Sequence, residues 1–187
     1  MLTVDTISYI SEKPCAIALG TFDGVHTGHR AVIETAVNAA RAEGIIPAVF
    51  TFSELPRNIF ASPNQRVFPL CSQAQKAALI EGLGVELLIT PPFDNSIRSM
   101  PAEGFITDIL IGNLNARHIV CGYDHRFGAN GGGSTDTLVR ICGSYGIAVT
   151  IIPPVMHEGV KISSTLIRSL IREGRIDDAR LLLGHDI

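Results

Sequence analysis

The chain has 187 residues, of which 46% are hydrophobic, and its formal net charge is −3 at pH 7. This length suits a single domain that can bury a substantial core. No apolar stretch reaches the roughly 18 residues that a membrane span needs, and residues 1–10 lack the basic and apolar regions of a secretory signal. Without a basic cluster, a nucleic-acid partner is not indicated. We therefore expect a cytoplasmic protein that acts on small molecules and binds neither nucleic acid nor membrane, although composition says nothing of its oligomeric state.

The cysteines lack the spacing of a metal site or a redox motif. Cys15, Cys71, Cys121 and Cys142 contain no C-x-x-C pair, and three of them lie in or beside apolar runs. Such residues are most simply reduced cysteines of the core.

Short apolar runs alternate with segments of helical periodicity along most of the chain. The pattern predicts strands over 16–19, 46–52, 86–90, 118–121 and 148–152, and helices over 31–42, 73–82, 102–110 and 135–145. Two further short helices, over 164–172 and 176–183, end the chain. Strands that alternate with helices imply right-handed crossovers. We therefore predict an α/β fold, a doubly wound parallel five-stranded sheet with a C-terminal helical tail.

The turn after the first predicted strand has the features of a phosphate site. It reads Gly20-Thr21-Phe22-Asp23-Gly24-Val25-His26-Thr27-Gly28-His29 and leads into a helix. Free amides and the positive end of the helix dipole favour an anion there. His26 and His29 are three residues apart and should share one face of the first turn, while Gly28 permits close backbone approach. The alternatives are a helix cap or a metal site, but paired ligands on a helix more often have i, i+4 spacing.

Two later segments could also bind a nucleotide. Ser163 or Ser164 should cap the helix over 164–172, and Leu166, Ile167, Leu170 and Ile171 then form a core face. Ser164, Thr165, Arg168 and Arg172 lie on the opposite face as a second anion site. An ordinary capped surface helix explains these residues equally well. After the fourth predicted strand, Asp124 could accept a ribose hydroxyl, and Arg126 and Phe127 could meet a phosphate and a ring.

Two other segments have a weaker signal. The glycines of 130–134 lack the spacing of a P-loop and predict a mobile connection. Phe52 follows the second predicted strand and could flank a flat ring, although a core position is commoner for such a residue.

These segments resemble, in the same order, the FAD synthetase (FMN adenylyltransferase) module of bacterial riboflavin kinase/FAD synthetases. Residues 20–29 are similar to that family's version of the HxGH nucleotidyltransferase signature, 122–128 to its G-x-D-x-R-F-G segment, and 162–168 to its I-S-S-T-x-I-R segment. The resemblance covers nearly all of the chain as one nucleotidyltransferase domain, 1–187, without the riboflavin kinase module that normally follows. It implies a Rossmann-like fold and the reaction ATP + FMN → FAD + pyrophosphate, with Mg²⁺.

The resemblance also implies roles for individual residues. His26 and His29 would hold the ATP phosphates and stabilise the transition state, while the backbone of Gly20, Thr21 and Phe22 would border the α-phosphate. Ser164, Thr165 and Arg168 would grip the β- and γ-phosphates. The other residues expected near ATP are Asp23, Gly28, Asp124 and Ser163, and those expected near the flavin are Phe52, Arg126 and Phe127.

The acceptor side departs from the family pattern. Residues 53–56 read Ser-Glu-Leu-Pro, where the family often has Asp-Pro-His-Pro. Lys161 stands where an arginine is frequent, and His125 where an aromatic residue is common. Two alternatives therefore stay open: a related nucleotidyltransferase with another phosphate acceptor, and a flavin- or nucleotide-binding protein without catalysis.

Overall fold

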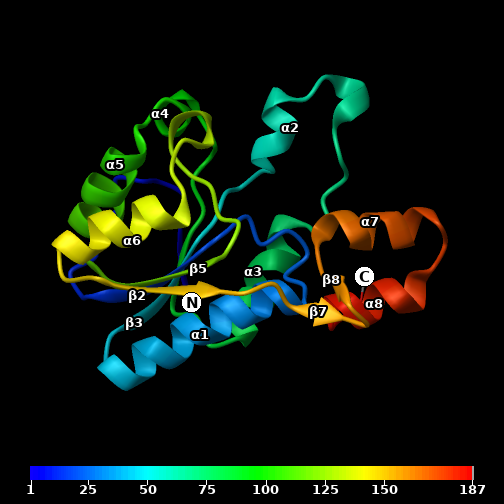
Figure 1. Cartoon of the computed structure of the whole chain (residues 1–187), viewed down its shortest axis with the longest axis horizontal. Helices are drawn as coiled ribbons and strands as arrows, with labels where there is room; N and C mark the ends of the chain where they lie inside the picture. Colours follow the sequence, from blue (N-terminus) through cyan, green and yellow to red (C-terminus); the bar gives the residue numbers. More distant parts are fainter. Residues whose placement is uncertain (187) are drawn as a thin grey trace.

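A computed structural model describes residues 1–186 and contains a central sheet with helices on both faces (Figure 1). The strands are β1 Leu2–Val4, β2 Cys15–Leu19, β3 Ile46–Phe50, β4 Leu87–Ile89, β5 Ala116–Gly122, β6 Ala148–Ile152, β7 Met156–His157 and β8 Val160–Lys161. The helices are α1 Thr27–Glu43, α2 Pro56–Phe60, α3 Gln73–Gly82, α4 Asn95–Arg98, α5 Ala102–Gly104, α6 Thr135–Ser144, α7 Ser164–Arg172 and α8 Ile176–Leu183, with short helical turns at Pro63–Gln65 and Ala129–Gly131. No helix within residues 1–186 is long and apolar enough to cross a membrane.

The main sheet has six parallel strands in the order β1-β4-β3-β2-β5-β6. The α/β prediction is confirmed, but the prediction of five strands is wrong because β1 was missed. β1 has only three residues, two of them exposed, and it pairs with β4 alone at the edge of the sheet. So short and exposed a strand leaves no apolar run in the sequence. β7 and β8, which form a separate antiparallel hairpin, were missed for the same reason.

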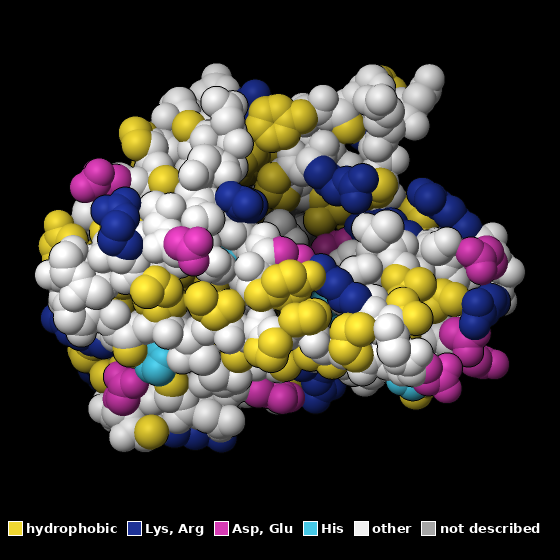
Figure 2. All heavy atoms as spheres, in the orientation of Figure 1, with side chains coloured by type: hydrophobic (Ala, Val, Ile, Leu, Met, Phe, Trp, Pro, Cys, Tyr) yellow, Lys and Arg dark blue, Asp and Glu magenta, His cyan; other side chains and the backbone are white. Residues whose placement is uncertain are grey.

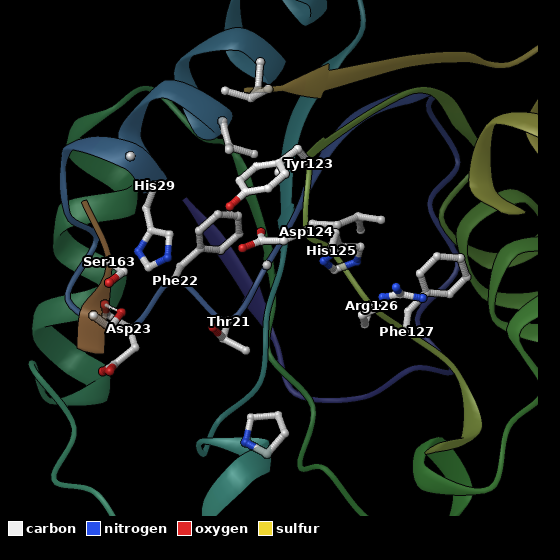
Figure 3. Close-up of a pocket in the computed structure, with 18 of the residues that line it drawn as sticks. Thr21, Phe22, Asp23, His29, Tyr123, Asp124, His125, Arg126, Phe127 and Ser163 are labelled. Atoms are coloured by element: carbon white, nitrogen blue, oxygen red, sulfur yellow. Dashed lines mark hydrogen bonds between the residues drawn. The ribbon is translucent and has the colours of Figure 1, made fainter. Parts of the chain in front are cut away.

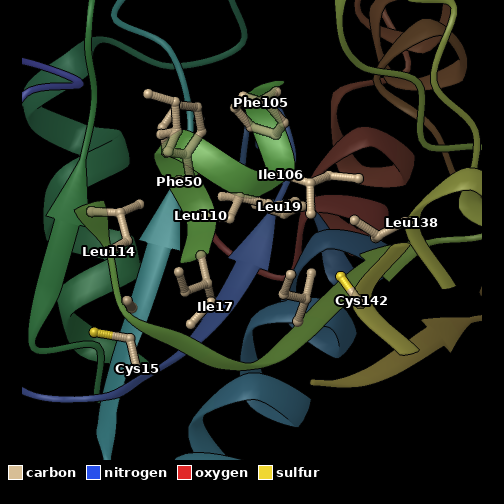
Figure 4. Close-up of a cluster of buried hydrophobic side chains, with 14 of the residues drawn as sticks. Cys15, Ile17, Leu19, Phe50, Phe105, Ile106, Leu110, Leu114, Leu138 and Cys142 are labelled. Atoms are coloured by element: carbon tan, nitrogen blue, oxygen red, sulfur yellow. The ribbon is translucent and has the colours of Figure 1, made fainter. Parts of the chain in front are cut away.

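Alternate residues of the central strands point into two separate cores. Ile17 and Leu19 of β2 face the side that is covered by α6 and the segment Phe105–Asn113, a cluster shown in Figure 4. Ala18 faces α1, where it packs with Ile33 and Val37. Burial on both faces explains why β2 is apolar at every position, as expected for a central parallel strand. Each fully buried aliphatic side chain adds about 1.5–3 kcal/mol to stability.

Local signals explain where the well-predicted helices begin. Ser72 and Gln75 form a reciprocal capping box at the start of α3, and Ser163 caps α7 by accepting a hydrogen bond from the Leu166 amide at 3.2 Å.

The predicted helix over 102–110 differs in the structure. It divides into the single turn α5 and a π-helix, Phe105–Asn113, whose wider turns a 3.6-residue pattern does not anticipate.

The sheet order places a crevice at the carboxyl ends of β2 and β5. The chain proceeds from β2 to β3 on one side, whereas β5 lies against the other edge of β2. Ligands of doubly wound folds bind at such a switch point. The helical tail completes this end of the molecule, because α7 and α8 pack around Leu70, Ile162 and Leu183 in a third cluster.

Candidate active site

A cavity of about 570 Å³ opens at the carboxyl ends of the strands. Figure 2 shows a hollow on this face with Lys and Arg side chains around its rim. One end of the cavity is polar and is formed by the turn after β2 and the start of α7. The other end is aromatic and contains Phe52, Phe93, Phe105 and Phe127. All of the residues predicted for the site line this one cavity: Gly20, Thr21, Phe22, Asp23, His26, Gly28, His29, Phe52, Asp124, Arg126, Phe127, Ser163, Ser164, Thr165 and Arg168.

His26 and His29 lie against each other at the start of α1. Their rings are stacked, with centroids 3.5 Å apart and an interplanar angle of 15°. His26 is also the N-cap of α1, since its Nδ1 accepts a hydrogen bond from the His29 amide at 3.2 Å. With Nδ1 acting as an acceptor, the proton of the neutral His26 ring resides on Nε2, which leaves that nitrogen as a donor. The cap interpretation and the shared-face interpretation of these residues are therefore compatible.

Both imidazoles are neutral at physiological pH. Burial lowers the pKa of His26 to about 4, and the positive charge of Lys161 lowers it further. The pKa of His29 lies well below its usual value because the ring is buried and because His26 and Lys76 are close. The Nδ1 atom of His29 is buried and has no hydrogen-bond partner among residues 1–186. The pair can thus offer hydrogen bonds to an anion without carrying formal charge.

Arg168 lines the cavity as predicted, but it is buried in an ion pair. Its guanidinium is 4% exposed and forms an ion pair with Asp23, which is also 4% exposed. Arg168 shares the cavity wall with Ser164 and Thr165, but it is buried, as Ile167 and Leu170 of the same helix are. A helical wheel assigns arginine to solvent because it cannot anticipate a carboxylate partner from the other end of the chain.

The other residues at the start of α7 make different contacts. Ser163 is the N-cap, and the Ser164 hydroxyl donates a hydrogen bond to the backbone oxygen of Asp23 at 3.0 Å. Thr165 is exposed at the cavity wall. The start of α7 is therefore tied to the turn after β2, and both border the same end of the cavity (Figure 3).

Tyr123, Asp124 and Lys161 form a polar cluster at the mouth of the cavity. Lys161 Nζ donates to the Tyr123 hydroxyl and to Asp124 Oδ2, both at 2.6 Å. These two hydrogen bonds raise the pKa of Lys161. Lys161 therefore joins the β8 hairpin to the segment after β5, and its charge acts on His26.

Aromatic side chains line the opposite end. Phe52 contacts Phe93 edge-on with centroids 4.8 Å apart, and the exposed Arg126 lines the same cavity. Phe127 is only 8% exposed and packs on Phe105, so it belongs mainly to the core. The glycine segment after it folds back over the Phe127 ring through a bridge between Phe127 and Gly133, rather than extending as a free loop.

Lys76 is a residue of this region that the sequence analysis missed. It is 5% exposed, and its ammonium donates to the Phe52 backbone oxygen at 2.8 Å. Burial lowers its pKa. It lines a second cavity of about 530 Å³ that shares Asp23, Leu55 and Phe93 with the first. The only signal in the sequence was a lysine in the first turn of a helix with an apolar face.

No group of three or more His, Cys, Asp or Glu side chains that could hold a metal ion occurs in the part of the chain that the structure describes. The cysteines are free, and Cys15, Cys121 and Cys142 are buried while Cys71 is partly exposed beside the second cavity. A protein cage for a cation is therefore not formed by residues 1–186.

The sheet order, the cavity at its switch point and the paired histidines at a helix N-terminus define a Rossmann-like α/β protein of the nucleotidyltransferase type. Comparison with known proteins identifies the family. The model of the FAD synthetase family matches residues 9–166, and the chain belongs to that family.

Individual relatives agree with this assignment. A FAD synthetase of Listeria monocytogenes is 34% identical over 92% of this chain and 70% of its own length. A bifunctional riboflavin kinase/FMN adenylyltransferase of Bacillus subtilis is 36% identical over 90% of the chain, and one of Escherichia coli is 29% identical over 97%. The chain spans only 53% and 58% of these two bifunctional relatives.

Solved structures show the same fold. A Streptococcus pneumoniae protein, described as a macrolide-efflux protein, aligns over 98% of this chain and 60% of its own with a TM-score of 0.85 and 30% identity. A pantoate-beta-alanine ligase of Francisella tularensis aligns over 95% of this chain and 76% of its own, with a TM-score of 0.57 and 14% identity, which indicates a shared fold alone.

Proposed function

We propose that this chain is an FMN adenylyltransferase, which transfers AMP from ATP to FMN and releases pyrophosphate. The observation that carries the proposal is one cavity with a polar end that contains the two histidines and an aromatic end, in a chain of the FAD synthetase family. A nucleotide and a flat aromatic acceptor need those two environments side by side. Because the chain spans little more than half of the bifunctional relatives, riboflavin kinase activity is not part of the proposal.

The reaction that suits this cavity is a direct in-line displacement. The phosphate oxygen of FMN attacks the α-phosphorus of ATP, the new P–O bond forms, and pyrophosphate leaves with the electrons of the broken bond. No covalent enzyme intermediate is required because the nucleophile is already an anion. The protein's task is to position two anions and to offset the charge that develops between them.

In this proposal the turn after β2 holds the α-phosphate. The Nε2 donor of His26 and the neutral His29 ring face the reacting group, and Gly28 lets the backbone come close. Ser163, Ser164 and Thr165 at the start of α7 border the β- and γ-phosphates, where the helix N-terminus favours an anion. Asp124 lies toward the nucleoside, and Phe52, Arg126 and Phe127 lie toward the flavin.

Mg²⁺ is the metal that this reaction class uses. Mg²⁺ is commonly held by substrate phosphates with one or two carboxylates, and Asp124 is a carboxylate in the wall of this cavity. Since residues 1–186 provide no larger cluster of ligands, we propose that Mg²⁺ arrives with ATP. When bound, it would neutralise phosphate charge.

The test is to incubate the protein with FMN, ATP and Mg²⁺ while following flavin fluorescence and pyrophosphate. FAD formation lowers the fluorescence as adenine stacks on the flavin, and one pyrophosphate should appear per FAD. The variant His26→Asn/His29→Asn should abolish both signals, whereas His157→Asn, on the β7–β8 hairpin, should retain them. Pyrophosphate release with a different phosphate acceptor, but not with FMN, would indicate a related nucleotidyltransferase. FMN binding without pyrophosphate release would indicate a protein that binds flavin without catalysis.

A further inference from the structure

The turn that carries the histidines has an unusual backbone. Phe22 and Val25 are non-glycine residues with φ angles of +46° and +39°, and Gly24 between them has φ of +79°. The left-handed region is costly for side chains such as phenylalanine and valine. A strained backbone of this kind persists only where its surroundings hold it in place.

Asp23, in the middle of the turn, is fixed by its side chain and its backbone. One carboxylate oxygen accepts a hydrogen bond from the Leu70 amide at 2.9 Å, and the other is paired with Arg168. The backbone oxygen of Asp23 accepts from the Ser164 hydroxyl at 3.0 Å. Each of these polar groups of Asp23 is therefore already engaged by another segment of the fold.

Arg168 is also held by hydrogen bonds to other segments of the fold. Its Nε donates to the Phe68 oxygen at 2.8 Å and its Nη1 to the Ser164 oxygen at 3.2 Å, while Nη2 is paired with Asp23. A guanidinium has five N–H donors in a fixed fork, and three distinct acceptors from three segments of the chain surround this one. Arg168 thus joins α7, the 68–70 segment and the turn.

The tail reinforces the same turn at two further points. The Thr27 hydroxyl donates to the Leu182 oxygen at 3.0 Å, and the His185 ring contacts the Gly24 oxygen through Nε2 at 2.7 Å. The helical pair α7–α8 therefore packs against the strained turn and supports it, while the first turn of α7 also lines the cavity (Figure 1).

We propose that Asp23 and Arg168 form a positioning pair that holds the His26–His29 turn in its reactive geometry, and that Arg168 acts through Asp23 rather than on the ATP phosphates. The proposal rests on the proposed adenylyltransferase function. It assigns Arg168 a role different from the phosphate contact that the family resemblance implies. A buried ion pair does not by itself indicate added stability, because well-packed apolar replacements are often as stable. The role that we assign to the Asp23–Arg168 pair is to fix the backbone geometry of the turn.

The test is a double-mutant cycle with Asp23→Asn, Arg168→Met and the combined variant. Removing either partner should lower kcat by about 10²-fold, the order of loss caused by a misplacement of about 1 Å, with the KM values for ATP and FMN within about 3-fold of wild type. If the two residues act as one unit, the combined variant should lose no more than either single variant. Arg140→Met is the control: it removes an exposed arginine of α6 that is not among the residues lining the cavity, and it should keep wild-type kinetics.

Hydrogen exchange provides an independent measurement of how firmly the turn is held. Hydrogen exchange of the amides over 20–29 should accelerate at least 10-fold in both single variants, while exchange in β2 and β5 stays at the wild-type rate. The combined variant removes both charges, so it should fold even where a single variant leaves an unpaired buried charge.

The outcomes separate the two proposals. Additive losses near 10⁴-fold, or a rise in KM for ATP confined to the Arg168 variants, would show that Arg168 contacts phosphate and would overturn the positioning pair. Unchanged exchange over 20–29 would overturn it as well. A wild-type protein that makes no FAD would overturn the proposed function instead, and the exchange experiment would still decide whether the pair holds the turn.

Discussion

Acidification should destabilise the protein through His26. This ring is 5% exposed, and its pKa is lowered from 6.5 to about 4, chiefly by burial. Protonation on Nδ1 would also remove the acceptor that caps α1. Since the folded-state pKa lies below the unfolded one, the unfolded chain binds the proton first, and stability that is present above pH 6.5 is lost as the pH falls toward 4. A shift of this size corresponds to about 3 kcal/mol, of which about 2 kcal/mol is lost between pH 7 and pH 4.5.

The assay is urea unfolding, followed by far-UV circular dichroism, at pH 7, 6, 5 and 4.5. His26→Asn keeps a side-chain acceptor for the helix cap but has no titrating group. Its free energy of unfolding should fall by about 2 kcal/mol less than that of the wild type over this range. His157→Asn, on the hairpin outside the cavity, should follow the wild type. Equal losses in the wild type and His26→Asn would refute the reasoning, because the burial of His26 would then not govern its titration.

His29→Ala should lower turnover by about 10²-fold or more, as expected when one transition-state donor is removed, and an unchanged kcat would contradict its role. Lys161→Met removes hydrogen bonds to Tyr123 and Asp124 and should raise the KM for ATP several-fold, while thermal unfolding stays nearly constant because exposed ion pairs contribute at most about 1 kcal/mol; an unchanged KM would remove this cluster from the site. Gly24→Ala places a Cβ 2.8 Å from the Leu70 Cβ at a φ of +79° and should cost about 2 kcal/mol or more in urea unfolding. Gly146→Ala, at a similar φ in open space, should cost clearly less, and equal costs would mean that close packing at Gly24 is unimportant.

Regular elements with local end signals were predictable from the sequence. The bounds of α3, α7 and α8 agree with the predicted ranges because serine caps or a terminal glycine mark where these helices begin or end. The doubly wound fold follows from the alternation of strands and helices. The edge strand β1 and the hairpin β7–β8 were missed because two or three partly exposed residues carry no periodic signal.

The parts of the site that are formed by residues close together in the sequence were predictable. The parts that depend on contacts between distant segments were not. The turn over 20–29 placed both histidines together at the cavity, as the spacing indicated. The partner of Arg168 lies 145 residues away, so its burial depends on tertiary contacts that helical periodicity does not contain. The neutrality of the histidines has the same origin, since burial by the rest of the fold lowers their pKa values.

Of the four cysteines, Cys71 alone is not buried and is therefore the residue open to covalent labelling. Cys15, Cys121 and Cys142 are fully buried, and burial raises the pKa values of Cys121 and Cys142 to about 11, so alkylating reagents should leave these sulfurs unmodified in the folded state. Cys71 is partly exposed at the wall of the second cavity, which also contains Asp23 and Lys76. Burial raises the pKa of Cys71 as well, but its partial exposure makes it the thiol that a fluorophore can reach, at a cavity that shares Asp23 with the candidate active site.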